Sequence, residues 1–284
     1  MNTLQVKKAL ESFLLEDIGQ GDLSTDLVFS QNTRGTGQFL VKETGILSGM
    51  DIPNLVYELL GEEVSYTALK QDGDYVEKGT VIATVSGSVR GMLTGERVIL
   101  NLMQRMSGIA TLTNQAVRQL NDSSIRICDT RKTAPGLRLF DKYAVTCGGG
   151  YNHRIGLYDG VMLKDNHIAY AGGILPAVKR VRSQLGHMVK IEVEIETKEE
   201  LLEAIQAECD VIMFDNRSPR EVKEFQKLVP SSILTEISGG ITLETISTYQ
   251  GTGANYLSLG FLTHSVKALD ISFNSNDIKE SNHE

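Results

Sequence analysis

Apolar and polar residues alternate with two different periods along this chain of 284 residues. Within residues 1–105, short runs of alternating apolar and polar residues are broken by glycine-containing turns, which predicts β-strands. Near the N-terminus, Leu4, Leu10, Phe13 and Leu14 recur at helical spacing instead, which predicts an amphipathic helix. The first part of the chain is therefore expected to be a mixed α/β scaffold.

From about residue 106 onward, strand patterns alternate with helical patterns. Helix start signals lie between the strands: Thr197 and Glu200 fit a capping box, as do Ser218 and Glu221. Repeated strand–helix units imply parallel strands with right-handed crossovers. Because no GxGxxG fingerprint follows the first strand, an α/β barrel, complete or incomplete, fits better than an open sheet. The predicted strands are Ile125–Asp129, Val161–Lys164, Lys190–Glu196, Val211–Asp215, Ile233–Ser238 and Asn255–Gly260.

Each of these strands has two distinct faces, because side chains alternate across a strand with a period of two. One face is apolar and suited to packing under helices. The other is polar, and in a barrel it points inward and ends at the mouth where barrel enzymes place their active sites. Glu192 or Glu236 could be a paired structural ion, but several buried carboxylates together require cations, a metal or a polar ligand. The residues of the polar face are Lys164, Glu192, Glu194, Glu196, Asp215, Glu236, Ser238, Ser258 and Gly260.

The stretch from Arg126 to Lys164 is basic, although the whole chain has a net charge of −8. Three acids, Asp129, Asp141 and Asp159, oppose seven basic residues, which leaves a local charge of +4. A cationic segment inside an acidic protein indicates a confined anion site rather than a surface for polyanions. The basic residues are Arg126, Arg131, Lys132, Arg138, Lys142, Arg154 and Lys164, with His153 beside Arg154.

Two glycine-containing loops after the last two predicted strands indicate phosphate binding. The loop 238–240 precedes a helix expected near residue 242, and Gly260 precedes a helix expected near residue 262 that carries His264. Backbone N–H groups at such helix starts bind phosphate. The acidic pair Glu194 and Asp215 suits Mg²⁺, held mainly by substrate phosphates. The five histidines lack HxH and HExxH spacing, which argues against a zinc site.

Composition narrows the class of protein. Hydrophobic residues make up 41% of the chain, and no apolar run reaches the length of a membrane span or of a signal-peptide core. Cys128, Cys147 and Cys209 form no CxxC motif, so neither a disulfide framework nor a structural zinc site is expected. The net negative charge argues against nucleic acid or an anionic membrane as the main partner. We expect a cytosolic (cytoplasmic) protein.

With these residues in hand, the chain resembles quinolinate phosphoribosyltransferase, also called carboxylating nicotinate-nucleotide pyrophosphorylase. The long phrases DTRKTAPGLR and CGGGYNHRIGLYD are specific to that family's pattern, and the matches follow one another over nearly the whole chain. The matching segments are EDIGQGDLSTD at 16–26, GERVILNLMQRMSGIAT at 95–111, DTRKTAPGLR at 129–138, KYAVTCGGGYNHRIGLYDGVMLKDNHI at 142–168, EVEIET at 192–197, IMFDN at 212–216, EISGGIT at 236–242 and YLSLGFLTHS at 256–265.

The resemblance implies an N-terminal open α/β sandwich over residues 1–105 and an incomplete TIM-like α/β barrel over 106–268. A strand near 269–275 would return to the first domain, and 276–284 would be a disordered tail. It also implies a homodimer, or a higher oligomer, in which Arg97 reaches into the neighbouring subunit's site. From the sequence alone, Arg97 would be interpreted as an ordinary charged residue on a helix.

The implied reaction joins quinolinate to phosphoribosyl pyrophosphate (PRPP), with Mg²⁺, and yields nicotinate mononucleotide, pyrophosphate and carbon dioxide. Lys164, Glu194 and Asp215 would be catalytic, and the two acids would also hold Mg²⁺, directly or indirectly. The quinolinate-binding residues would be Arg97, Arg131, His153, Arg154 and Lys164. The phosphate-binding residues would be Lys132, Ser238, Gly239, Gly240, Gly260 and His264.

Three other interpretations remain open from the sequence. Lys164 on a barrel strand could form a Schiff base, as in class I aldolases. The phrase DGDYVEKG at 72–79 is similar to the hairpin of biotinyl and lipoyl carriers, although no symmetric second half follows it. The family's paralogue from molybdenum-transport operons is the closest alternative, but CGGGYNHR looks more like the quinolinate branch.

Overall fold

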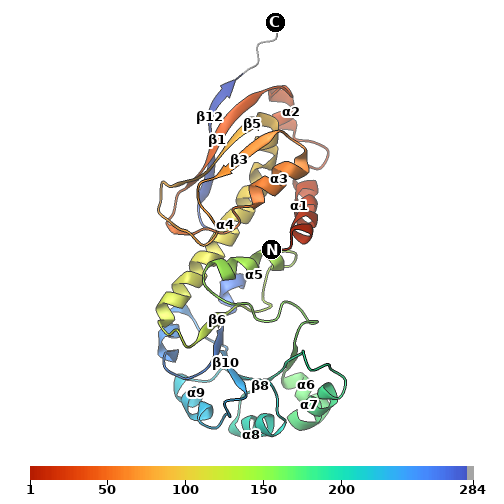
Figure 1. The fold of residues 1–284 in the computed structure, drawn as a ribbon, viewed down its shortest axis with the longest axis vertical. Coiled ribbons are helices and arrows are strands. Elements are labelled where there is room, and N and C mark those ends of the chain that lie inside the picture. Colours follow the sequence, from red (N-terminus) through yellow and green to blue (C-terminus); the bar gives the residue numbers. More distant parts are fainter. Residues whose placement is uncertain (280–284) are drawn as a thin grey trace. The chain divides into compact units, whose positions relative to one another are not determined.

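The computed structural model describes residues 1–279, which form two compact units (Figure 1). The first unit contains Met1–Leu112, Ala134–Gly149 and the segment from Ser265 onward. The second contains Thr113–Thr133 and Gly150–His264. Residues 134–149 thus belong to the first unit, whereas the sequence boundaries had put them with the barrel.

A four-stranded antiparallel sheet, in the order β12-β1-β5-β3, forms the centre of the first unit. Buried and exposed residues alternate along β1, as expected for a sheet with one face against the core. The phrase at 72–79 contributes a strand of only two residues, which pairs with another of the same length. The strands are β1 Arg34–Val41, β2 Gly45–Ile46, β3 Val64–Ala68, β4 Tyr75–Val76, β5 Val81–Ser88 and β12 Ile271–Lys279.

Helices complete the first unit. The predicted N-terminal helix is confirmed as α1, which buries Val6, Leu10 and Leu14. Helix α4 is the longest and runs from the first unit into the second. The helices are α1 Thr3–Ile18, α2 Leu23–Val28, α3 Ile52–Leu60, α4 Val89–Leu120 and α5 Arg138–Cys147.

The C-terminal strand β12 returns to the first unit and extends further than the sequence indicated. It pairs with β1 from Val41↔Ile271 to Arg34↔Lys279, so residues 276–279 lie in a strand. Pairing with β1 gives the backbone groups of this polar segment their hydrogen-bond partners. The rest of the predicted tail, 280–284, lies outside the described residues.

The second unit contains a six-stranded parallel sheet in the order β6-β11-β10-β9-β8-β7. The first strand pairs with the last, so the sheet curls round in chain order like a barrel. In the described residues β6 and β7 do not pair with each other, and the free side of β6 makes one isolated bridge, Cys128↔Tyr151. The barrel is therefore incomplete, and the predicted fold class is confirmed. The strands are β6 Arg126–Cys128, β7 Val161–Leu163, β8 Ile191–Ile195, β9 Val211–Asp215, β10 Leu234–Ser238 and β11 Tyr256–Ser258.

Short helices follow the strands and lie around this sheet (Figure 1). Both predicted capping boxes, Thr197 with Glu200 and Ser218 with Glu221, are present. No helix in the described part of the chain combines the length and apolarity needed to cross a membrane. The helices are α6 Asp165–Ala171, α7 Ile174–Arg182, α8 Lys198–Gln206, α9 Pro219–Gln226, α10 Leu243–Ile246, the 3₁₀ helix η1 Ser247–Tyr249 and α11 Phe261–His264.

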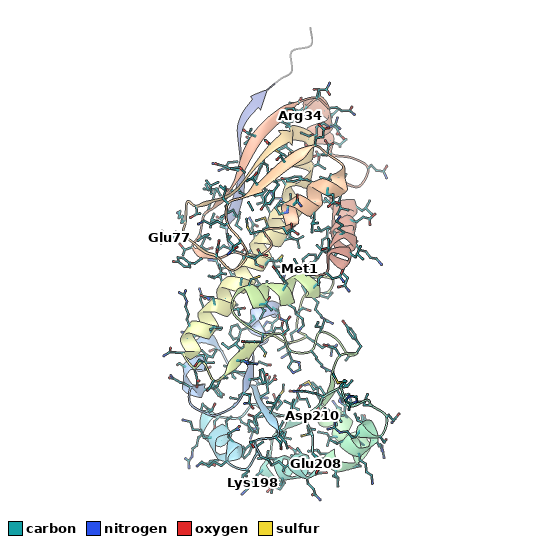
Figure 2. All side chains as sticks on the ribbon, viewed as in Figure 1. Met1, Arg34, Glu77, Lys198, Glu208 and Asp210 are labelled. Atoms are coloured by element: carbon teal, nitrogen blue, oxygen red, sulfur yellow. The ribbon has the colours of Figure 1, made fainter. Side chains whose placement is uncertain are left out.

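The two predicted faces of the barrel strands are also confirmed, and Figure 2 shows their side chains among all those described. On β8, Ile191, Val193 and Ile195 are at most 1% exposed. Glu192 lies between them in sequence and points the other way, toward the ring of His153. Because side chains alternate between the two faces of each strand, polar side chains lie inside the barrel.

Candidate active site

A cavity of about 470 Å³ lies at the carboxyl ends of β10 and β11, beside the loop that follows β6. It contains all six residues that the sequence assigned to phosphate, although they come from three separate segments of the chain. These residues are Lys132, Ser238, Gly239, Gly240, Gly260 and His264. The helices expected near residues 242 and 262 begin at Leu243 and Phe261.

The backbone of this cavity requires glycine at position 239 and leaves little room for a Cβ at position 260. Gly239 has φ +92°, and a Cβ there would lie 2.3 Å from Asn216 Oδ1. The main-chain N–H of Asn216 donates to Ser238 O at 2.8 Å, which fixes the approach of the two loops. A Cβ on Gly260 would lie 3.1 Å from Lys132 Cδ and 3.2 Å from His264 Cδ2. Glycine therefore lets both basic side chains approach the strand end.

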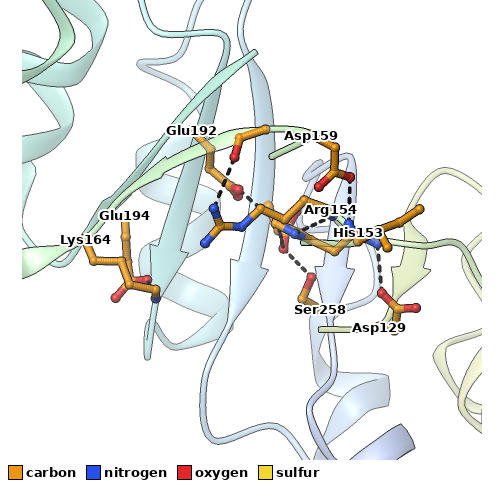
Figure 3. Close-up of polar contacts among 11 residues, drawn as sticks. Asp129, His153, Arg154, Asp159, Lys164, Glu192, Glu194 and Ser258 are labelled. Carbon is orange, nitrogen blue, oxygen red and sulfur yellow. Dashed lines mark hydrogen bonds and ion pairs between the residues drawn. The ribbon is translucent and has the colours of Figure 1, made fainter. Parts of the chain in front are cut away.

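Two of the predicted catalytic residues form an ion pair. Lys164 Nζ contacts the carboxylate of Glu194, at the ends of the neighbouring strands β7 and β8 (Figure 3). The main-chain N–H of Lys164 donates to Nδ1 of His167 at 3.1 Å, so His167 braces the start of α6. Asp215 ends β9 beside Ser238 and accepts a hydrogen bond of 2.7 Å from Asn216 Nδ2.

Two arginines of the basic stretch lie close together. The pKa of Arg154 is lowered by burial and by the positive charge of Arg131. Arg154 Nη1 donates to the carbonyl of Gly160 at 3.1 Å, whereas Nε of Arg131 is buried without a hydrogen-bond partner among the described residues. Like charges held together in this way indicate a site for an anion, since burying an unpaired donor is otherwise costly.

His153 lies inside the barrel among carboxylates. Its Nε2 is 2.9 Å from Glu192 Oε2 and 3.5 Å from Glu236 Oε1 (Figure 3). Its main-chain N–H donates to Asp129 Oδ1 at 2.9 Å, and Asp129 is fully buried. The hydroxyl of Ser258 donates to Glu236. Burial, together with the charge of Glu192, raises the pKa of Glu236 to about 8, although His153 and Ser258 oppose the shift.

A second cavity, of about 530 Å³, opens toward the amino ends of the strands. Its lining includes the first residues of β7, β9, β10 and β11, together with His153 and Arg154. His153 and Arg154 thus line this second cavity, and neither lines the cavity at the carboxyl ends of β10 and β11.

The remaining basic residues do not all belong to this part of the molecule. Arg138 and Lys142 lie on α5, in the first unit, where Asp141 makes a bidentate ion pair of 2.8 Å with Arg105. Arg97 is an exposed residue of α4, also in the first unit. The local charge of +4 therefore divides between the two units.

Sequence reasoning missed some contacts of this site. Asp129 was counted only as an opposing charge, although it follows β6 directly, where a strand-end residue could have been suspected. The only indication for Asn216 in the sequence was its position directly after Asp215, at the end of a strand. Ser258 was placed on the inward face without a partner. Such pairings join residues far apart in the chain, so only the barrel brings them together.

The arrangement can bind a substrate with two kinds of anionic group. Arg131, Arg154 and Lys164 can pair with carboxylates, and arginine does so bidentately. The adjacent residue Lys132, with the glycine loops, can hold phosphates. Glu194 and Asp215 can stabilise positive charge that develops between these groups. No covalent nucleophile is needed for such a reaction.

Comparison with known proteins agrees with this chemistry. Residues 22–107 match the N-terminal domain of quinolinate phosphoribosyl transferase, and residues 109–274 match its C-terminal domain. A probable carboxylating nicotinate-nucleotide pyrophosphorylase of Bacillus subtilis is 58% identical over 96% of this chain and 94% of its own length. A chloroplastic one of Arabidopsis thaliana is 41% identical over 95% of this chain and 82% of its own length.

Solved structures give the same result. The crystal structure of NadC from Streptococcus pyogenes superposes with a TM-score of 0.93 at 39% identity, over 98% of each chain. That agreement covers both units, including the antiparallel sheet and the incomplete barrel. By its sequence and by its fold, the chain belongs to the quinolinate phosphoribosyl transferase family.

Proposed function

We propose that this chain transfers a phosphoribosyl group from PRPP to the ring nitrogen of quinolinate, with loss of carbon dioxide. The products are nicotinate mononucleotide, pyrophosphate and CO₂, which makes the reaction a step of NAD biosynthesis. The names of the relatives support this assignment, because they are carboxylating nicotinate-nucleotide pyrophosphorylases.

One observation carries the proposal. Arg131 and Arg154 are neighbouring cations, and Nε of Arg131 is buried without a partner, so the site is prepared for an anionic ligand. The next residue, Lys132, lines the glycine-rich cavity, so the two anion sites share one short segment. Quinolinate is a planar dicarboxylate, and PRPP carries a phosphate and a pyrophosphate. The pair of substrates matches the pair of sites.

The chemistry follows from positioning and charge. Arg131, Arg154 and Lys164 hold the two carboxylates and direct the ring nitrogen toward the ribose carbon that carries pyrophosphate. As the bond to pyrophosphate breaks, positive charge develops on the ribose, and the carboxylates of Glu194 and Asp215 stabilise it. The ribosylated ring is then quaternised. It accepts the electron pair released when the adjacent carboxylate leaves as CO₂, and a proton takes the vacated position.

Mg²⁺ is the proposed metal. The residues fit it, because Glu194 and Asp215 offer carboxylate oxygens at neighbouring strand ends, and Mg²⁺ is commonly held by one or two carboxylates plus substrate phosphates. Each carboxylate already uses one oxygen, toward Lys164 and Asn216 respectively. Asp215 is the stronger candidate, since the ammonium of Lys164 offsets the charge of Glu194. When bound, the ion would neutralise the departing pyrophosphate.

The proposed assembly is a homodimer in the cytoplasm, with Arg97 of each subunit completing the site of the other. Two features support this. Arg97 is exposed on α4 beside the half-buried Arg105, and both line a cavity of the first unit. Large apolar side chains on α1 and α2, such as Leu4 and Leu27, are more than 80% exposed, as in a surface that a partner covers.

The direct test is to incubate the protein with quinolinate, PRPP and Mg²⁺ and to measure nicotinate mononucleotide and released CO₂. Nicotinic acid is the matched control substrate, because it lacks one carboxylate and leaves cationic donors unpaired, at about 1–3 kcal/mol per group. Quinolinate should be preferred by at least about tenfold. Equal turnover of both acids, or no nicotinate mononucleotide, would contradict the proposal.

A further inference from the structure

Side-chain contacts join His153, Glu192, Glu236 and Ser258 inside the barrel, and Asp129 accepts from the main-chain N–H of His153; these five residues are called here the His153 network. All but His153 are at most 6% exposed, and the His153 side chain is 13% exposed. His153, Glu192 and Glu236 also line the second cavity, and Oε1 of Glu192 has no hydrogen-bond partner among the described residues. The hydrogen bonds to the two ring nitrogens of His153 specify where the ring proton lies.

The ring of His153 is the centre of the network, and its backbone neighbour fixes the tautomer. The main-chain N–H of Arg154 donates to Nδ1 of His153 at 2.8 Å, so Nδ1 acts as an acceptor and carries no proton. The proton of the neutral ring is then on Nε2. Nε2 lies 2.9 Å from Glu192 Oε2, which accepts that proton's hydrogen bond.

The same geometry speaks against a metal ion in this cluster. One ligand atom each from His153, Glu192 and Glu236 lies within 4.8 Å of the others, which is a spacing that a metal could bridge. A neutral histidine that binds metal through Nε2 carries its proton on Nδ1. Here that proton would point at the N–H of Arg154, so two donors would face each other. Hydrogen bonding, not metal binding, fits the arrangement.

We propose that Glu192 and Glu236 are positioning residues of the active site, which hold the His153 ring with its proton on Nε2 so that the ring orients Arg154 toward the substrate. The last step rests on the proposed function. In this arrangement both ring nitrogens of His153 are engaged within the protein. The ring acts on Arg154 through its main-chain N–H, while the guanidinium of Arg154 donates to the carbonyl of Gly160. Figure 3 shows His153 between Glu192 and Asp129, with Arg154 beside it.

The tautomer can be measured directly, without any assay of activity. Long-range ¹H–¹⁵N spectra of the whole protein labelled with ¹⁵N-histidine, recorded at pH 7, distinguish the two neutral tautomers and the charged ring. A His153→Gln variant assigns the signal among the five histidines. We expect the Nε2–H tautomer, with no change when an equimolar amount of Zn²⁺ is added. An Nδ1–H tautomer, a doubly protonated ring or a metal-induced shift of this signal would overturn the proposal.

The effect on Arg154 is tested by a conservative pair of variants. Glu192→Gln retains an acceptor for Nε2–H, and Glu192→Leu removes it while filling a similar volume. We expect Glu192→Leu to raise the KM and the calorimetric Kd for quinolinate on the order of tenfold, as when an orienting group is removed, and to leave the KM for PRPP unchanged. Glu192→Gln should restore most of the affinity.

The matched control is Glu199→Leu, which alters an exposed glutamate on helix α8, after the same strand. It should leave both constants unchanged. A folded Glu192→Leu enzyme with wild-type affinity for quinolinate, or equal losses in both Glu192 variants, would contradict the positioning role. If the wild-type protein makes no nicotinate mononucleotide, the proposed function is wrong. The tautomer of the His153 ring is still tested independently by the NMR spectra.

Discussion

The ammonium group of Lys164 pairs with the carboxylate of Glu194, across the ends of neighbouring strands β7 and β8. The carboxylate therefore occupies Nζ of Lys164, the atom that a Schiff-base lysine must have available to attack a carbonyl group. The pair therefore supports a lysine that binds an anion, and it counts against the aldolase interpretation.

The first prediction tests that difference. Treatment with borohydride in the presence of a small keto acid should add no covalent mass to Lys164. The Lys164→Ala variant should lose affinity for quinolinate, because a cationic donor is gone, with a cost of about 1–3 kcal/mol. Intact-protein mass spectrometry and the KM for quinolinate are the measurements. A trapped adduct on Lys164 would restore the aldolase interpretation.

The second prediction concerns Asp215, at the end of β9. Asp215→Asn keeps the shape of the side chain and removes its charge. If the carboxylate stabilises positive charge on the ribose, kcat should fall on the order of 10²-fold, with a smaller change in the KM for quinolinate. More Mg²⁺ should also be needed for half-maximal activity. Glu199→Gln, at an exposed position on α8, is the control. A normal kcat in the Asp215→Asn variant would show that this carboxylate has only a structural role.

The third prediction uses the phosphate cavity. Gly239→Ala places a Cβ 2.3 Å from Asn216 Oδ1 at a φ of +92°, so the loop must move. Gly251→Ala introduces a similar backbone strain, at φ +66°, but with no atom within 4 Å. Both variants should lose stability, by about 1–2 kcal/mol. Only Gly239→Ala should raise the KM for PRPP, by about tenfold or more for a displaced binding loop. Equal kinetic effects would mean that the loop does not contact phosphate.

Strand alternation explains why much of the site could be predicted from sequence. Lys164, Glu194, Asp215 and Ser238 share a face because side chains alternate with a fixed period, and parallel strands bring their carboxyl ends to one edge. The glycines at 239 and 240 have positive φ, a conformation that favours glycine and was visible as a turn signal.

Contacts between distant segments could not be predicted in this way. The pairing of His153 with Glu192 and Glu236 joins three segments, and its geometry depends on how the barrel curls. From the sequence, Glu192 and Glu236 could therefore be recognised only as charges that need partners. Arg138 stands within the basic stretch, yet the chain crosses into the first unit at Ala134, which charge counting does not reveal. The role of Arg97 rests on the family resemblance alone.

The fourth prediction concerns Arg97. If each subunit supplies Arg97 to its neighbour, mixing Arg97→Ala with Lys164→Ala should restore activity, assayed at a low quinolinate concentration at which each variant alone gives little turnover. In a hybrid dimer, one site carries both lesions and the other carries none. Equal mixing makes half of the dimers hybrid, with half of their sites intact, so roughly a quarter of the wild-type activity should return. Two separately tagged batches of Arg97→Ala are the control and should gain no activity on mixing. No recovery, with subunit exchange shown by co-purification of the tags, would count against a shared site.

The last prediction concerns the buried carboxyl group of Glu236, whose pKa is raised from 4.5 to about 8 by burial and by the charge of Glu192. His153 and Ser258 lower this pKa, and the more distant Asp129 raises it. Below about pH 4.5, the folded and unfolded states both hold the proton. Between pH 4.5 and 8, the unfolded chain releases it while the folded protein keeps it, so unfolding releases a proton and is favoured as the pH rises.

Glu236→Gln removes this linkage, because glutamine does not titrate, yet its amide oxygen can still accept from Ser258. The melting temperature of the variant should therefore rise relative to the wild type as the pH increases from 5 to 8, and the difference should level off above about pH 8. A change of roughly 2 °C or more is expected, since about 1 kcal/mol shifts the melting temperature by that amount in proteins near this size. Calorimetry at matched ionic strength measures it, with Glu196→Gln as the exposed control. A difference that stays constant from pH 5 to 9 would mean that Glu236 titrates alike in the folded and unfolded states, and that the barrel interior carries both negative charges at neutral pH.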